Sequence, residues 1–286
     1  MKFRPNVAFA SFALMCAELL AAATQNLPAT PPDPGPAPVK YRWQQRLPLA
    51  PNYAQLVAEA RPAAQSGDAD AQFALHVAFS FCRDGLRKRS AEELRRFPDA
   101  VIQDMHRRCD ALAVQDPDLA GEADRWFALA LKAGFPRALA FAARDTAGRI
   151  EREKTGGGER AKALAVARSR LVRALRANDP GVTFVVPNTL HVFFPGDRRV
   201  KPAISLWMLA ACEQGLECGV NAAWMRDICN MRRDCRDGET GIQYAQRAAG
   251  NPVWLPARAR ALATMLRNSR FDEAAFAETV TSLPIP

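Results

Sequence analysis

Histidine and the recognised catalytic motifs are scarce in this chain of 286 residues. Its three histidines, His76, His106 and His191, form no H-E-x-x-H pattern, and no serine lies in a G-x-S-x-G turn. The glycine-rich loop at 153–160 has no strand before it and no Lys-Ser/Thr after it. These absences exclude the usual signatures of zinc proteases, serine hydrolases and P-loop enzymes. A strand-like apolar stretch occurs only at 182–194 (VTFVVPNTLHVFF), which argues against an all-β fold.

Acidic residues are too few to balance the basic ones. The chain has 39 Lys and Arg, of which 32 are Arg, against 30 Asp and Glu, so its formal net charge is +9. This excess favours anionic partners, but scattered arginines on a solvated surface explain it better, since the basic residues form no block. No run of five or six basic residues occurs, so we expect no nucleic-acid partner.

The N-terminus resembles a targeting segment rather than part of the fold. Lys2 and Arg4 precede an apolar stretch at 7–20 and three alanines at 21–23. This order predicts a signal peptide at 1–23, cleaved near Ala23, and a periplasmic or secreted protein with no membrane span after cleavage. The alternative is a retained anchor. Cys16 follows Leu14 and Met15, which are bulkier than a lipidation site requires, so we place it in the removed peptide.

The next segment is rich in proline. Six prolines lie between Pro28 and Pro38, and we expect residues 24–50 to form a stiff, extended linker. A helical domain at 51–286 would follow it, because Ala, Leu and Arg abound there with apolar residues three and four apart. Removing residues 1–23 takes away two basic residues and one acidic one, which leaves a charge of +8 and six cysteines.

An even number of cysteines in an exported chain indicates disulfides. We expect the pairs Cys82–Cys109, Cys212–Cys218 and Cys229–Cys235, the last two each stapling a turn, although six cysteines permit other pairings. A zinc site is the rival interpretation. It lacks the usual ligand spacing and a nearby histidine, so we predict neither a metal nor a cofactor.

One turn recurs along the chain and ends one helix before the next begins. Its central residues are Gly67, Gly134, Asn178, Gly215 and Gly250. Asparagine is the usual substitute for glycine where the backbone angle φ is positive. The last three turns are 37 and 35 residues apart in the sequence, and the longer first interval predicts an insertion around 84–118. A fixed period of this size is typical of helical repeats.

Large and small residues keep their places around these turns. The expected packing positions are Ala71, Trp126, Ala130, Ala138, Trp207, Ala211 and Gly219. Small residues let two helices approach closely, and each tryptophan would fill the space between neighbouring hairpins. Ile242 lies eight residues before Gly250, where the other units have their tryptophan. We therefore predict an all-α fold, an α-solenoid of stacked antiparallel helix hairpins stapled by disulfides.

The segments from Trp126 to Ala138 and from Trp207 to Gly219 resemble the W-[YFM]-x-x-A-A-x-x-G-x-x-x-A pattern of Sel-one-like repeats, which are relatives of tetratricopeptide repeats. Residues 66–75 (SGDADAQFAL) are similar to the start of such a repeat, and 194–207 to its inter-helix loop. The resemblance covers roughly residues 53–266. It implies a solenoid used for protein–protein contacts, without catalytic residues.

These features predict a non-enzymatic adaptor or scaffold of the cell envelope that binds a protein or peptide. The alternative is a binding module for an anionic cell-wall or outer-membrane polymer, favoured by the positive charge. A cell-wall hydrolase is a third hypothesis. It would use paired carboxylates, for which Glu92, Glu93, Glu122 and Asp124 are available.

Overall fold

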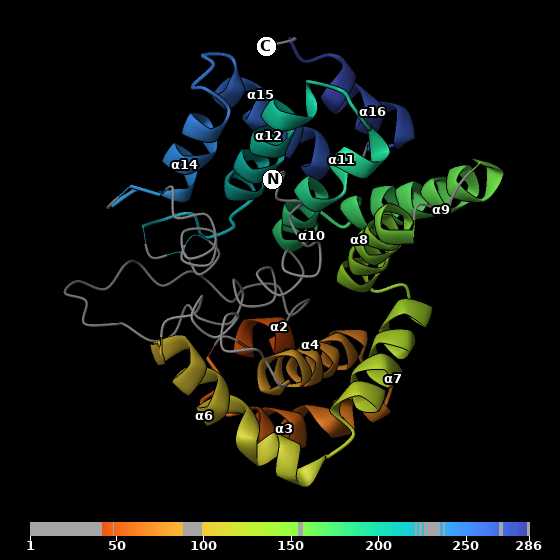
Figure 1. Cartoon of the computed structure of the whole chain (residues 1–286), viewed down its shortest axis with the longest axis vertical. Helices are drawn as coiled ribbons and strands as arrows, with labels where there is room; N and C mark the ends of the chain where they lie inside the picture. The colour runs from red at the N-terminus through yellow and green to blue at the C-terminus, as the bar shows by residue number, and fades with distance from the viewer. Residues whose placement is uncertain are drawn as a thin grey trace, which may run out of the picture. The chain divides into compact units, whose positions relative to one another are not determined.

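The computed structural model describes residues 42–47, 49–87, 99–153, 157–220, 222, 225, 235–236, 238–268 and 271–284. All regular elements in these ranges are helical (Figure 1). They form two compact units, here called the N-terminal unit (described residues up to 133) and the C-terminal unit (described residues from 134). No helix within the described ranges combines the length and the apolar character needed to cross a membrane. The expected signal peptide, Glu92, Glu93 and Cys229 lie outside the described residues.

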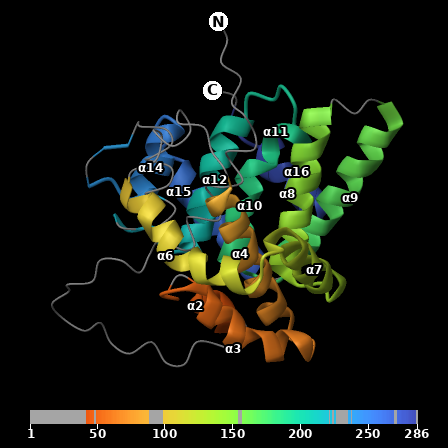
Figure 2. The same cartoon turned by 60° about the horizontal axis from the view of Figure 1, so that its bottom comes forward.

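The described part of the N-terminal unit contains five helices, four of which pack against the fifth (Figure 2). They are α2 (Arg42–Arg46), α3 (Tyr53–Gln65), α4 (Ala69–Leu86), α6 (Asp99–Gln115) and α7 (Leu119–Lys132). The central helix is α4, which packs against the other four. It is buried on nearly all sides along residues 70–82, as expected for an apolar helix that is covered by its neighbours.

Aromatic side chains and one disulfide hold this unit together. The rings of Tyr53 and Phe81 meet in a T-shaped arrangement with 5.5 Å between their centroids, which joins α3 to α4. Trp126 from α7 is also fully buried. Cys82 of α4 is bonded to Cys109 of α6, with an S–S distance of 2.14 Å and both residues buried. This is the expected pair, and it joins α4 to α6.

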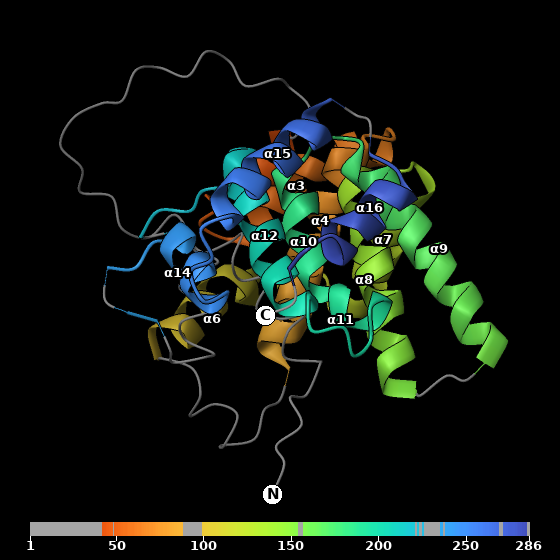
Figure 3. The same cartoon turned by 90° about the horizontal axis from the view of Figure 1, so that it is seen from above.

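The C-terminal unit is built around α12 (Figure 3). Its elements are α8 (Pro136–Glu153), α9 (Gly157–Leu175), α10 (Pro180–Val185), the 3-10 helix η2 (Val186–Asn188), α11 (Leu190–Phe193), α12 (Val200–Glu213), α14 (Gly241–Ala248), α15 (Leu255–Arg267) and α16 (Glu273–Thr281). Helices α10, α14, α15 and α16 all contact α12, whereas α9 packs mainly against α8.

A cluster of aromatic rings forms the centre of this unit. The indole of Trp207 in α12 meets Phe271 at 5.7 Å and Phe276 at 5.9 Å between ring centroids, and Phe276 in turn meets Phe193. Each ring lies edge-on or tilted to its neighbours, the arrangement favoured by aromatic quadrupoles. The second expected disulfide, Cys212–Cys218, has an S–S distance of 1.93 Å and spans the turn at Gly215. Cys235 is also disulfide-bonded.

Two expectations about secondary structure are wrong. The stretch 182–194 is not a strand: it belongs to α10, η2 and α11. Most of its apolar residues are buried because these short helical turns face α8 and α12. The linker was also expected to extend to residue 50, which is too far. Residues 42–46 form α2, and Trp43 and Leu47 are buried, so the folded part begins before residue 51.

All five expected turn residues have positive φ: Gly67 98°, Gly134 73°, Asn178 53°, Gly215 104° and Gly250 86°. Three of these turns share one hydrogen bond. The backbone N–H of the next residue donates to the carbonyl five residues earlier, as in Asp68 to Ala63, Leu216 to Ala211 and Asn251 to Gln246. This is the Schellman arrangement, which closes a helix on a left-handed residue.

Most of the expected packing positions lie in the core. Trp126, Ala130, Trp207 and Ala211 are buried, as are Ala71 and Ala138 after their turns. Gly219 was expected to match them, and it does not. It lies in an exposed bend, because residues 216–220 leave the turn without continuing as a helix. Ile242 is also exposed, and the buried aromatic residue of α14 is Tyr244, two positions later.

A buried ion pair fixes the start of α10. The guanidinium of Arg137 in α8 donates to both oxygens of Asp179, at 2.7 and 3.1 Å, and the Asp179 side chain is 0% exposed. The same carboxylate accepts the backbone N–H of Gly181 at 2.9 Å and so caps α10. A side chain at position 181 would collide with Arg137. The pair therefore ties α8, the Asn178 turn and α10 together.

Replacing Gly215 by Ala should destabilise the C-terminal unit by about 1–2 kcal/mol, because an L-residue is strained at positive φ. A side chain at 215 meets nothing within 4 Å, so the effect would come from the backbone alone. Gly219→Ala is the matched control, since its surroundings are equally open and its φ is not positive. Urea unfolding of both variants measures the difference. Equal free energies of unfolding would contradict the strain argument.

Asp179→Ala should destabilise this unit by about 3–5 kcal/mol, because it leaves the Arg137 guanidinium without its carboxylate in a buried site. Asp197→Ala removes an Arg–Asp pair nearer the surface, Asp197–Arg199, and is expected to have a much smaller effect. The check is thermal and urea unfolding of both variants side by side. If Asp179→Ala lowered the free energy of unfolding no more than Asp197→Ala does, the buried pair would not be a major source of stability.

Candidate functional site

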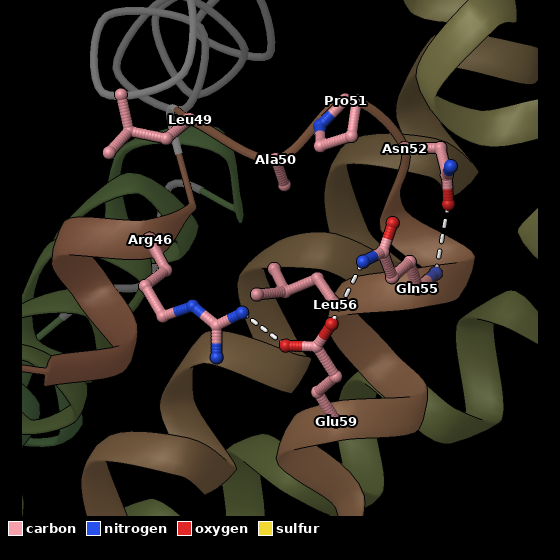
Figure 4. Close-up of a pocket in the computed structure, with 8 residues that line it drawn as sticks. All are labelled: Arg46, Leu49, Ala50, Pro51, Asn52, Gln55, Leu56 and Glu59. Carbon is pink, nitrogen blue, oxygen red and sulfur yellow. Dashed lines mark hydrogen bonds and ion pairs between the residues drawn. The ribbon is translucent and has the colours of Figure 1, made fainter.

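An apolar depression, here called the notch, lies between α2 and the start of α3 (Figure 4). Its volume is about 200 Å³. It is lined by Arg46, Leu49, Ala50, Pro51, Asn52, Gln55, Leu56 and Glu59. All of these residues belong to the N-terminal unit, so the notch lies within one compact unit of the chain.

Helix α2 is short, and contacts with α4 hold it in place. The backbone N–H of Trp43 donates to Oδ2 of Asp70 at 2.7 Å. The indole of Trp43 is buried, and the guanidinium groups of Arg42 and Arg46 lie over its ring at 5.0 and 4.9 Å from the centroid. A helix of five residues is not stable alone, so these contacts set the position of the notch wall.

The segment between α2 and α3 contains one buried and one exposed leucine. Leu47 is fully buried, whereas Leu49 is 67% exposed beside the notch. Asn52 then begins α3, because its side chain accepts the backbone N–H of Gln55 at 2.8 Å. Arg107 of α6 donates to the carbonyl of Pro51 at 3.1 Å and holds this segment from the other side. The floor of the notch is apolar and contains Ala50 and Leu56.

The rim of the notch is charged. Arg46 and Glu59 form an ion pair across it, and the side chain of Gln55 donates to Glu59 at 2.9 Å (Figure 4). These hydrogen bonds, first from Arg46 and then from Gln55, hold the pKa of Glu59 below its ordinary value of 4.5. Glu59 is thus a fixed anion at neutral pH. A lowered pKa suits a binding contact and is the opposite of what a general acid requires.

The size and chemistry of the notch favour the binding of one apolar side chain. Pockets for drug-sized ligands usually measure about 300–1,000 Å³, so this one is small for a substrate or cofactor. An apolar floor with a charged rim is the usual anatomy of a small protein–protein contact. Sequence reasoning missed this site, because residues 42–50 were assigned to the linker. The signal that could have revealed it is the pattern of two leucines and two prolines at 47–51.

A second, polar depression of about 320 Å³ lies in the C-terminal unit. Arg236, Gly238, Glu239, Gln243, Gln246, Arg247 and Asn251 line it. Glu239 accepts two hydrogen bonds from Arg247, at 2.7 and 2.8 Å, and one from the backbone of Arg236. The bonds from Arg247 lower the pKa of Glu239 more than its burial raises it. This carboxylate therefore fixes the loop before α14 and is not poised for acid–base chemistry.

The three histidines are in separate places. His76 is buried in α4, with Nδ1 3.0 Å from the carbonyl of Ala123 and its ring against Phe127. His106 and His191 are exposed and contact the carboxylates of Asp110 and Glu151 at 3.1 Å. The contacts of His76 therefore stabilise the core, and those of His106 and His191 lie on the surface. The described residues contain no group of three metal-ligating side chains.

The carboxylates considered for a hydrolase are not paired in the described residues. Glu122 is engaged by Arg125 at 3.2 Å and by the indole N–H of Trp126 at 2.9 Å, which orients that buried tryptophan. Asp124 is exposed two residues along the same helix. Neither of them lines the notch or the polar depression.

No protein-family model matches the chain, and comparisons with curated proteins and with solved structures give no match either. The turns, the notch and the surface charges are therefore the features that bear on function.

Glu59 should titrate below pH 4.5, because Arg46 and Gln55 stabilise its charged form. The stability that this pair contributes would be present at neutral pH and lost as the pH falls through the lowered pKa. Carboxyl ¹³C NMR titration measures the midpoint, and Arg46→Ala should move it upward. Arg42→Ala is the control, since Arg42 lies over Trp43 and not beside Glu59. An unchanged titration midpoint of Glu59 in Arg46→Ala would contradict this description of the rim.

Proposed function

We propose that this chain is a non-enzymatic adaptor built from Sel-one-like helical repeats, whose stacked hairpins present binding surfaces to a protein or peptide partner. The observation that carries the proposal is the set of five helix-ending turns at positive φ, recurring at Gly67, Gly134, Asn178, Gly215 and Gly250. Repeat proteins of this kind use extended surfaces for recognition, and recognition of that type needs no catalytic group.

The notch is the proposed anchor point for the partner. Leu49 is exposed beside an apolar floor, and a partner side chain that filled the notch would remove both from water. Arg46 and Glu59 at the rim would then orient polar groups around that anchor. Interfaces commonly derive most of their affinity from a few such buried anchors surrounded by polar contacts.

Export to the periplasm or the cell surface is the second part of the proposal. The basic start, the apolar stretch at 7–20 and the alanines at 21–23 support a signal peptide. The disulfides Cys82–Cys109 and Cys212–Cys218 are consistent with an oxidising compartment, where such bonds persist.

Binding of an anionic envelope polymer is the second candidate function, and the net charge of +9 favours it. The two candidates differ in their response to salt. Attraction to a polymer through many exposed charges should weaken steeply between low and moderate ionic strength, whereas an apolar anchor in the notch should not.

A photo-crosslinking residue placed at Leu49 should capture a specific protein from envelope extract, because Leu49 borders the notch. The same residue at Val114 is the matched control, since Val114 is 81% exposed in the same unit and lies outside the notch. Mass spectrometry identifies the captured species, and the experiment is repeated at raised salt. Equal capture from both positions would contradict the notch as an anchor. Recovery of polymer alone, lost at raised salt, would support the second candidate.

A further inference from the structure

We infer that the solvent-facing side of α15 is a second docking surface, and that it binds an acidic helical segment of the partner protein. This inference rests on the proposed function, because it assumes that the partner is a protein. It concerns a different unit of the chain from the notch, and it names the chemistry that the partner must present.

Helix α15 buries one side and leaves the other exposed. Leu255, Ala259, Leu262 and Leu266 face the core, where α15 packs against α12. The exposed side consists of Ala257, Arg258, Arg260, Ala261, Thr264, Met265, Arg267 and Asn268, and Val253, just before the helix, is 97% exposed. At 100° per residue, Arg260 and Arg267 lie along one edge of this side and Arg258 along the other. Ala257, Ala261 and Thr264 lie between the two edges.

The sequence from before α14 to the end of α15 carries charges of one sign. Residues 240–271 contain no Asp or Glu and five arginines. Within the described part of the chain, the three arginines of α15 form no ion pair. Arg258 donates to the carbonyl and hydroxyl oxygens of Ser282, and Arg267 donates to the backbone carbonyl of Glu213 and to Thr264. These neutral acceptors leave the positive charges uncompensated, so the surface is complementary to an anion.

The shape of this surface favours a helix over a flat anionic surface. Its centre is made of small side chains, and its edges carry long arginines. Small residues let two helix backbones approach closely, so a partner helix can lie along this face between the arginines. A membrane-binding helix would instead need bulky apolar side chains along its exposed face. Here only Val253 and Met265 are large and apolar.

The spacing of the arginines indicates what the partner helix must carry. Arg260 and Arg267 are seven residues apart, which is two helical turns or roughly 10 Å along the axis. Carboxylates two turns apart on a partner helix would face both of them at once. The guanidinium group also binds carboxylates in a bidentate manner, which adds orientation to the attraction.

The test uses the folded, disulfide-bonded chain and a stapled helical peptide made of Ala and Glu, with its carboxylates along one face. Fluorescence anisotropy measures binding of this peptide. Polyglutamate, which is disordered at neutral pH, supplies the same charge without the helix, and phosphatidylglycerol vesicles supply an anionic membrane. We expect measurable binding of the stapled peptide and weaker binding of both other probes at the same ionic strength.

Two variants of the exposed face test separately how its charge and its shape contribute to peptide binding. The double variant Arg260→Glu and Arg267→Glu should weaken binding of the stapled peptide by on the order of tenfold or more, because attraction becomes repulsion. Ala261→Trp should weaken it as well, since a large ring would keep a partner helix away from the small residues of this face. Arg152→Glu is the matched control for charge, because Arg152 is exposed on α8 in the same unit. All of these positions are exposed, so the fold should tolerate the changes.

Loss of binding with both α15 variants and not with Arg152→Glu supports the inference. Equal binding of polyglutamate or vesicles, unaffected by Ala261→Trp, would overturn it in favour of general attraction to anions. Failure of the stapled peptide to bind would also overturn it. Crosslinking from Leu49 is then repeated with the double variant: continued capture of a protein would leave the adaptor function standing while this inference falls.

Discussion

The constraint on which both units depend is the left-handed residue that ends a helix. A helix can reverse direction within two residues only if one of them has positive φ, and glycine or asparagine adopts that conformation at the lowest cost. At Gly215 the turn also positions the Cys212–Cys218 disulfide, and at Asn178 it presents Asp179 to Arg137. The backbone conformation at these positions determines which helices can pack together, and side-chain contacts then stabilise that packing.

Much of the helical architecture was predictable from the sequence, because its signals are local. A left-handed residue such as Gly67, an aspartate cap such as Asp68 and an apolar period of three to four residues act within one turn of helix. The disulfide Cys82–Cys109 joins residues 27 apart and was predicted on other grounds, from the even number of cysteines and the pairing of the other four among themselves. The stretch 182–194 was misjudged, because β-branched residues also suit short buried helical turns when neighbouring helices supply the contacts.

The candidate sites were less predictable, because they arise from long-range packing. Nothing near α2 in the sequence shows that Asp70, far along the chain, will receive the backbone of Trp43 and bring Arg46 toward Glu59. The exposed face of α15 is similar, since the exposure of Ala261 depends on where α12 lies. Composition gave the net charge, but only the fold shows where arginines stand without a carboxylate partner.

The bond between Cys82 and Cys109 also changes what a cut in the chain would mean. Residues 83–108 lie inside a covalent ring, so a protease that cleaved any one peptide bond there would open the ring without separating the two ends of the protein. The helices α3 and α4 would stay attached to α6 and α7 through sulfur. Two pieces joined in this way remain at the high local concentration that favours reassociation. A single cut in this segment would therefore break the backbone without dividing the protein into two separate molecules.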